Sequence, residues 1–175
     1  MTPRVVLVGL PGSGKTTVGT AAAAALGVAF RDTDADVEAQ TGTTIADLFT
    51  EQGEAHFREL EERAVAAALR DHDGVLALGG GAVTSAATRR ALRLHGRDRG
   101  AVVWLDVDAE AAAERVGRGL DRPLLTGDPR PRLRVLVEQR APLYAEVATA
   151  TVDTGGRDVA AVTADVLAVA GEEVR

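Results

Sequence analysis

Gly9-Leu10-Pro11-Gly12-Ser13-Gly14-Lys15-Thr16 is the stretch that decides the fold, because it matches G-x-x-x-x-G-K-[S/T] at every fixed position. The glycines let successive backbone N–H groups turn toward one anion. Lys15 adds a compact positive charge for the outer phosphates, and Thr16 offers a hydroxyl to a divalent cation. An apolar run precedes the loop and an Ala-rich run follows it, so the loop is expected between a strand and a helix.

Lys15 is also the only lysine among the 20 Lys and Arg residues of the chain. All the others are arginine. Because a compact ammonium fits a phosphate nest better than a planar guanidinium does, the single lysine stands at the position where lysine is needed. A guanine-binding Asn-Lys-x-Asp motif would need a second lysine, which argues against a GTPase switch. A regulatory ATPase usually brings a larger assembly domain than this length allows.

The composition of the chain limits the classes of protein and of binding site that it can form. The 175 residues are 46% apolar, which suits one domain over 1–175. Without cysteine the chain has no disulfide and no thiolate metal site. A formal net charge of −6 argues against nucleic acid as the main partner. The apolar run Val5–Val8 is too short for a signal sequence or a membrane span, so we expect a cytoplasmic protein with no membrane partner.

Apolar runs alternate with helical patterns along the whole chain. This alternation predicts an α/β fold with a parallel sheet covered on both faces, whose ligands bind at the carboxyl ends of the strands. A loop rich in Gly and Pro is expected over 117–131. The expected strands are 4–8, 28–31, 75–78, 101–106 and 150–152, and the expected helices are 15–26, 34–41, 45–70 with a break near Gly53, 86–94, 109–116, 131–147 and 158–170.

Asp32 and Asp34 follow the second expected strand. If this segment is extended, both carboxylates point the same way, so one could hold Mg²⁺ and the other could orient a substrate hydroxyl. The alternative is an ordinary helix cap by Asp34. Asp106 follows four apolar residues, a pattern typical of the strand whose terminal Asp holds Mg²⁺ in many P-loop enzymes. It is therefore an alternative to Asp32 as the metal ligand.

Most arginines are expected on the solvated surface, as charged residues usually are. Arg89, Arg90, Arg93, Arg97 and Arg99 fit that description. Four others stand out by position, because an arginine on a loop can close over phosphates and paired arginines can bind a carboxylate. These four are Arg58, Arg122, Arg140 and Arg157.

Together these motifs resemble those of the shikimate kinase family over nearly the whole chain. The P-loop alone is shared by many families, but its combination with the other motifs is much more specific. The motifs are Gly9–Thr16, Asp32-Thr33-Asp34, Phe57-Arg58 with Glu61, Leu78-Gly79-Gly80-Gly81-Ala82, Arg122-Pro123-Leu124-Leu125, Arg140-Ala141-Pro142-Leu143-Tyr144 and Val152-Asp153-Thr154.

The resemblance implies a P-loop NTPase fold like that of the nucleoside monophosphate kinases, with a five-stranded parallel sheet and a mobile lid. It implies ATP-dependent phosphorylation of the 3-hydroxyl of shikimate, on the route to chorismate and aromatic amino acids. The substrate-binding region would be about 33–62 and the lid about 112–131. We expect a monomer whose partners are shikimate and ATP, with one Mg²⁺ per site.

The resemblance also implies a role for each matched residue. Lys15, Asp34 and Arg122 would be catalytic, while Thr16 and Asp32 would hold Mg²⁺. ATP would contact Gly12, Ser13, Gly14, Lys15, Thr16, Thr17, Arg122 and Arg157, and shikimate would contact Asp34, Arg58, Gly80 and Arg140. Phe49 and Phe57 would form pocket walls.

Four departures or alternatives stay open. The segment Arg97–Gly100 is longer than the family pattern, as in a surface loop, and the two glycines before Arg157 replace bulkier polar residues. Arg115 and Arg118 could share the lid role with Arg122. Another small-molecule kinase of this fold, such as a gluconate or nucleotide kinase, would share the P-loop and the lid.

The two metal candidates make opposite predictions for the magnesium dependence of activity. Asp32→Asn should raise the Mg²⁺ concentration needed for half-maximal phosphoryl transfer, because it removes one ligand charge, whereas Asp106→Asn should leave it unchanged. Titration of both variants with MgCl₂ measures this. A change confined to Asp106→Asn would show that the assignment of Asp32 is wrong.

Overall fold

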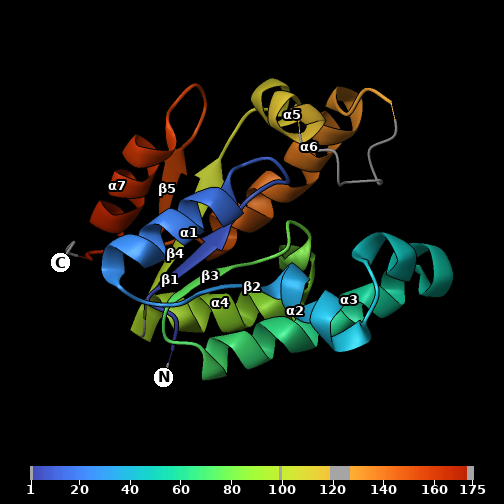
Figure 1. The fold of residues 1–175 in the computed structure, drawn as a ribbon, viewed down its shortest axis with the longest axis horizontal. Coiled ribbons are helices and arrows are strands. Elements are labelled where there is room, and N and C mark those ends of the chain that lie inside the picture. Colours follow the sequence, from blue (N-terminus) through green and yellow to red (C-terminus); the bar gives the residue numbers. More distant parts are fainter. Residues whose placement is uncertain (1, 99, 119–126, 173–175) are drawn as a thin grey trace.

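The computed structural model describes residues 2–98, 100–118 and 127–172, with the side chains of 117 and 118 also outside the description. Five parallel strands form one sheet in the order β2-β3-β1-β4-β5, with helices on both faces (Figure 1). The elements are β1 (Val5–Val8), α1 (Lys15–Leu26), β2 (Phe30–Asp32), α2 (Thr33–Thr41), α3 (Ile45–Asp71), β3 (Val75–Ala77), the 3₁₀ turn η1 (Ala82–Thr84), α4 (Ala86–Asp98), β4 (Ala101–Asp106), α5 (Ala109–Arg118), α6 (Arg130–Val147), β5 (Ala150–Asp153) and α7 (Val159–Val169).

Each central strand is buried on both sides, which explains why its sequence is continuously apolar rather than alternating. In β1, Val5 and Leu7 pack toward α1 and α7, while Val6 and Val8 pack toward α3, α4 and α6. Figure 1 shows the same division, with α1 and α7 on one side of the strands and α3 and α4 on the other. The expected parallel sheet covered on both faces is confirmed.

Strand order places the loop after β1 at the centre of the carboxyl edge. β1 pairs with β3 on one side and with β4 on the other, so Gly9–Thr16 lies between the ends of those two strands. β2 lies beyond β3, and its register aligns Asp32 with Ala77. The residues after β2 and β3 therefore meet the phosphate-binding loop from one side, and those after β4 and β5 meet it from the other.

Helix boundaries follow the sequence patterns closely, and the end of α4 is the clearest difference. The helix expected over 86–94 continues to Asp98, so the described part of the Arg97–Gly100 segment begins as helix rather than as a surface loop. The expected break in α3 occurs at Gly53, whose φ of 82° and ψ of 165° is a conformation that only glycine adopts readily. The turn at Gly53 brings the second part of α3 back under the sheet.

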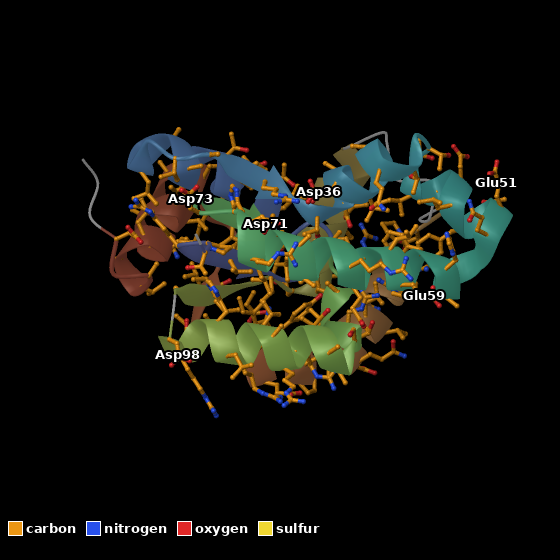
Figure 2. All side chains as sticks on the ribbon, turned by 90° about the horizontal axis from the view of Figure 1, so that it is seen from below. Asp36, Glu51, Glu59, Asp71, Asp73 and Asp98 are labelled. Carbon is orange, nitrogen blue, oxygen red and sulfur yellow. The ribbon has the colours of Figure 1, made fainter. Side chains whose placement is uncertain are left out.

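The negative charge of the chain is distributed over the surface. Figure 2 labels Asp36, Glu51, Glu59, Asp71, Asp73 and Asp98, which are spread along the side of the molecule formed by α2, α3 and the end of α4. Asp36 pairs with Arg31 at 2.7 Å. Within the described residues, no helix combines the length and the apolar character that crossing a membrane requires.

Candidate active site

The loop Gly9–Thr16 adopts the backbone conformation that its glycines allow. Gly12 and Gly14 have φ values of 81° and 92°, in the left-handed region that disfavours side chains. A Cβ at Gly12 would lie 2.7 Å from the carbonyl oxygen of Ala112 in α5, so the loop also needs glycine for close packing. Gly14 is the N-cap of α1 and supplies no capping side chain. The N–H donors of the first helical turn can therefore serve an anion.

Lys15 places its ammonium group over this same loop. Its Nζ donates to the carbonyl oxygens of Gly9 at 2.8 Å and Leu10 at 2.9 Å. The side chain also lines the cleft formed with the end of β2. The charge is thus held beside the anion-binding backbone rather than directed to bulk solvent.

Thr16 and Asp32 bring two hard oxygen ligands together at the mouth of the loop. The Thr16 hydroxyl donates to one carboxylate oxygen of Asp32 at 3.1 Å. The other oxygen of Asp32 accepts from the backbone N–H of Asp34 at 3.0 Å, which makes Asp32 the N-cap of α2. The expectation of an extended Asp32–Asp34 segment is therefore wrong, since Asp34 lies in the first turn of α2 and the capping residue is Asp32.

A cleft of about 400 Å³ joins the loop to the ends of β2 and β3. Asp32 and Asp34 both line it despite their different backbone conformations, whereas Asp106 lies at the end of β4, where its carbonyl oxygen accepts from Thr154. The lining residues are Gly12, Gly14, Lys15, Thr16, Thr17, Asp32, Asp34, Leu78, Gly80, Arg115 and Val116. Ser13, which the sequence also predicts to bind the nucleotide, is a fully buried residue of the loop.

The turn Gly79–Gly81 after β3 lies against three charged side chains. A Cβ at Gly79 would collide with carboxylate oxygens of Asp34 and Glu61, the latter at 2.5 Å. A Cβ at Gly81 would overlap the Arg58 guanidinium. The N–H of Gly79 donates to the Thr33 hydroxyl at 3.1 Å, which fixes the turn to the start of α2. Side chains in this turn would displace the charged groups, so the run of glycines follows from close approach.

Arg58 projects from α3 into this region and is held by carboxylates on its own helix. It donates to Glu61 at 2.6 Å and to Glu54 at 3.1 Å, and its guanidinium carbon lies 5.2 Å from the centre of the Phe57 ring. Phe57 is buried and packs on Phe49 with ring centres 4.8 Å apart. The Phe57 ring, which packs on Phe49, therefore supports the position of the Arg58 guanidinium.

Glu61 is a buried carboxyl, 3% exposed, within this group. Burial raises its pKa, and the charge and hydrogen bond of Arg58, together with the charge of Arg140, oppose that rise. The same pairing raises the pKa of Arg58 against the effect of its own burial. Arg58 and Arg140, predicted from separate parts of the sequence, are thus near one carboxyl.

Two arginines predicted or considered for the nucleotide side, Arg115 and Arg157, have different surroundings. Arg115 donates to the carbonyl oxygen of Gly12 at 3.3 Å and to the Thr154 hydroxyl at 2.9 Å, so it joins the loop to the end of β5. Arg157 donates to the carbonyl oxygen of Asp153 at 3.1 Å and pairs with Asp165 at 2.7 Å. Arg122, and much of the lid region about 112–131, lies outside the described residues, as does the side chain of Arg118.

Sequence reasoning assigned no site role to Thr33, Glu61 or Tyr144. Thr33 bonds Gly79 of the glycine turn, and Glu61 and Tyr144 contact the predicted site residues Arg58 and Gly80. The Tyr144 hydroxyl donates to the carbonyl oxygen of Gly80 at 2.6 Å. Arg58 and Glu61 are three residues apart on a helix, a spacing that predicts an ion pair. Nothing in the linear pattern places Tyr144, at the other end of the chain, beside the glycine turn.

Comparison with known proteins gives one consistent result. The sequence pattern of the shikimate kinase family matches residues 11–170. A shikimate kinase of Frankia casuarinae is 58% identical over 166 residues, covering 95% of this chain and 71% of the relative. A shikimate kinase from Acinetobacter baumannii, solved in complex with shikimate, superposes with a TM-score of 0.86 at 38% identity, covering 95% of this chain and 91% of that one.

A gluconokinase from Sinorhizobium meliloti shares the fold with a TM-score of 0.63 at 22% identity, covering 96% of this chain and 91% of its own. That likeness extends to the architecture alone. Because a kinase named for another acceptor has this architecture, the acceptor must be argued from the side chains around the cleft.

The raised pKa of Glu61 predicts how one substitution changes stability with pH. A carboxyl whose pKa is higher in the folded than in the unfolded protein contributes stability below its unfolded pKa and loses it as pH rises through the folded pKa. The free energy of unfolding of the wild type, relative to Glu61→Gln, should therefore be greater near pH 4 than near pH 7. Urea unfolding at both pH values measures it, with Glu62→Gln as the exposed neighbouring control. The opposite sign would mean that attraction to Arg58 outweighs burial.

Proposed function

The chain belongs to the shikimate kinase family, and we propose that it transfers the γ-phosphoryl group of ATP to the 3-hydroxyl of shikimate, forming shikimate 3-phosphate and ADP on the route to aromatic amino acids. The observation that carries this proposal is the glycine turn after β3. Gly80 lines the phosphate cleft, while its neighbours Gly79 and Gly81 lie against Asp34, Glu61 and Arg58. One turn thus adjoins both a phosphate-binding loop and a group of charges suited to a small hydroxylated acid.

The nucleotide half of the proposal rests on the loop after β1. Backbone N–H groups of the loop and of the first turn of α1, from Gly12 to Thr17, would bind the phosphates. Lys15 would exchange its bonds to the Gly9 and Leu10 carbonyl oxygens for phosphate oxygens. An ammonium held beside the transferring group stabilises the charge that develops there.

Thr16 and Asp32 fit a Mg²⁺ ion, because a hydroxyl and a carboxylate 3.1 Å apart are the hard oxygen ligands that this ion prefers. When bound, Mg²⁺ would neutralise phosphate charge. Asp32 also caps α2 with its other oxygen, so its position is fixed by the backbone. A carboxylate anchored in this way needs little reordering to receive a cation.

The acceptor half of the proposal places four residues around shikimate. Arg58 and Arg140 would bind its carboxylate, since guanidinium groups pair with carboxylates through two parallel hydrogen bonds. Gly80 would present its backbone to the ring. Asp34, which lines the same cleft as Lys15, would orient the 3-hydroxyl and accept its proton as the O–P bond forms and the bond to ADP breaks.

Arg122 and Arg157 stay predictions as contacts of ATP. Arg115 supports the nucleotide side in a different way, because it bonds the carbonyl oxygen of Gly12 and can fix the loop before any ligand binds. A monomeric state and a cytoplasmic location also stay predictions. They do not affect the assignment of the reaction.

A direct assay separates this function from its alternatives. With ATP and Mg²⁺, ADP release should require shikimate and should be near background with gluconate or with water as acceptor. Lys15→Ala is the matched control for a contaminating kinase, because it removes the charge beside the phosphates. Rapid ADP release without an acceptor would instead indicate a nucleotide switch, and release with gluconate alone would indicate a kinase of another acid.

Arg140→Ala should change the KM values for the two substrates unequally. If Arg140 binds the carboxylate of shikimate, its loss should raise KM for shikimate by about tenfold or more, the usual effect of a lost charged hydrogen bond, and leave KM for ATP nearly unchanged. Initial-rate kinetics at saturating co-substrate measure both constants. Gln139→Ala, an exposed neighbour on α6, is the control. Equal increases in both KM values would exclude a carboxylate-binding role.

A further inference from the structure

Tyr144 is the largest fully buried side chain of the protein's described residues, and it ends in a polar atom. It lies on α6 and is 1% exposed. Its ring packs against Trp104 of β4 with ring centres 5.8 Å apart. Its hydroxyl donates to the carbonyl oxygen of Gly80 at 2.6 Å, across 64 positions of sequence. A buried hydroxyl directed at one backbone carbonyl fixes the distance between α6 and the glycine turn.

Arg140 lies four positions earlier on α6, so its side chain and that of Tyr144 project from the same face of the helix. Burial raises the pKa of Tyr144 to about 12, and the charge and a hydrogen bond of Arg140 oppose this rise. A phenol with this pKa keeps its proton at neutral pH and therefore remains a donor to Gly80. Its oxygen can accept from Arg140 at the same time. One hydroxyl can thus serve both the arginine and the turn.

Gly80 is where the two halves of the site meet. A Cβ there would lie 2.9 Å from the Pro11 ring and 3.4 Å from the carbonyl oxygen of Gly9, so the residue is in close contact with the phosphate-binding loop. Gly81 beside it packs against Arg58. A shift of Gly80 would therefore change the spacing between the phosphate-binding loop and the arginines.

Arg89 makes a second connection between α6 and the segment after this turn. It donates to the carbonyl oxygens of Val83 at 2.8 Å and Thr84 at 3.1 Å, and it pairs with Glu146 of α6 at 2.9 Å. The sequence predicted Arg89 on a solvated face, but its side chain is 19% exposed and tied to η1. This connection anchors α6 to η1, while Tyr144 acts on Gly80 itself.

We propose that Tyr144 is a positioning residue that holds Arg140 in register with the Gly80 backbone, so that an acid bound by Arg140 presents its hydroxyl toward the phosphates. This inference rests on the function proposed above. Tyr144 would not touch the reacting atoms. It would act by fixing the guanidinium through its hydroxyl oxygen and the turn through its hydroxyl proton.

Tyr144→Phe tests the inference, because it removes one oxygen and keeps the ring that packs on Trp104. KM for shikimate should rise by about fivefold, the effect expected when one neutral hydrogen bond is lost, with KM for ATP changing by less than about twofold. Arg93→Gln is the matched control: it removes an exposed ion pair between α4 and Glu146 of α6 and leaves Gly80 untouched. That variant should alter neither constant.

Tyr144 is the only tyrosine of the chain, so incorporation of 3-fluorotyrosine replaces this residue alone and keeps a hydroxyl. The fluorinated protein should retain a KM for shikimate near that of the wild type. A rise equal to that of Tyr144→Phe would mean that ring packing, not the hydroxyl, determines the effect, and would overturn the proposal.

A double-variant comparison gives an independent criterion. If Tyr144 acts through Arg140, adding Tyr144→Phe to Arg140→Ala should change KM for shikimate much less than it does in the wild type. Multiplicative effects, or equal changes in both KM values for Tyr144→Phe, would overturn the inference while leaving the proposed function intact. A wild-type chain that releases no ADP with shikimate would instead overturn the proposed function, and this inference with it.

Discussion

The absence of side chains at Gly79, Gly80 and Gly81 is the constraint on which the rest of the site depends. The space that their Cβ atoms would occupy is filled by Asp34 and Glu61, by Pro11 and by Arg58. Charged groups from α2 and α3 can therefore approach the end of β3 until they contact its backbone. Because Gly80 also lines the phosphate cleft, the glycine turn connects these charged groups to the cleft that contains Lys15.

Strand order explains why the two halves of the site come from different parts of the chain. With β1 at the centre of the sheet, the loop Gly9–Thr16 has the ends of β2 and β3 on one side and those of β4 and β5 on the other. Asp34 and Arg58, which we propose bind the acceptor, follow β2, and the arginines that contact the end of β5, Arg115 and Arg157, lie opposite. Arg140 and Tyr144 reach the glycine turn and its charged neighbours from α6, which follows β4 in the sequence.

Local chemistry made much of this predictable from the sequence. Parallel strands buried on both faces have apolar runs, helix α1 begins where the glycine loop ends, and Gly53 breaks α3, so the architecture followed from residue patterns. The backbone conformation of Asp32–Asp34 did not follow from the sequence pattern. The segment could have continued as a strand, but the Asp32 carboxylate caps α2 and Asp34 lies in its first turn. The contacts of Glu61 and Tyr144 depend on tertiary packing, and no spacing in the sequence encodes which distant carbonyl a buried hydroxyl will meet.

The site uses arginine around the glycine turn and lysine in the phosphate-binding loop, and the geometry of each place explains the choice. Around the glycine turn the cations are Arg58 and Arg140, whose planar groups can share a buried carboxyl such as Glu61 and still present N–H donors to a ligand. An ammonium would lose that geometry. In the phosphate-binding loop the requirement is reversed, because a compact charge must fit beside backbone carbonyls 2.8 and 2.9 Å away and then move to phosphate oxygens. The single lysine suits the phosphate-binding loop and the two arginines suit the neighbouring glycine turn, because the two places require different charge geometries.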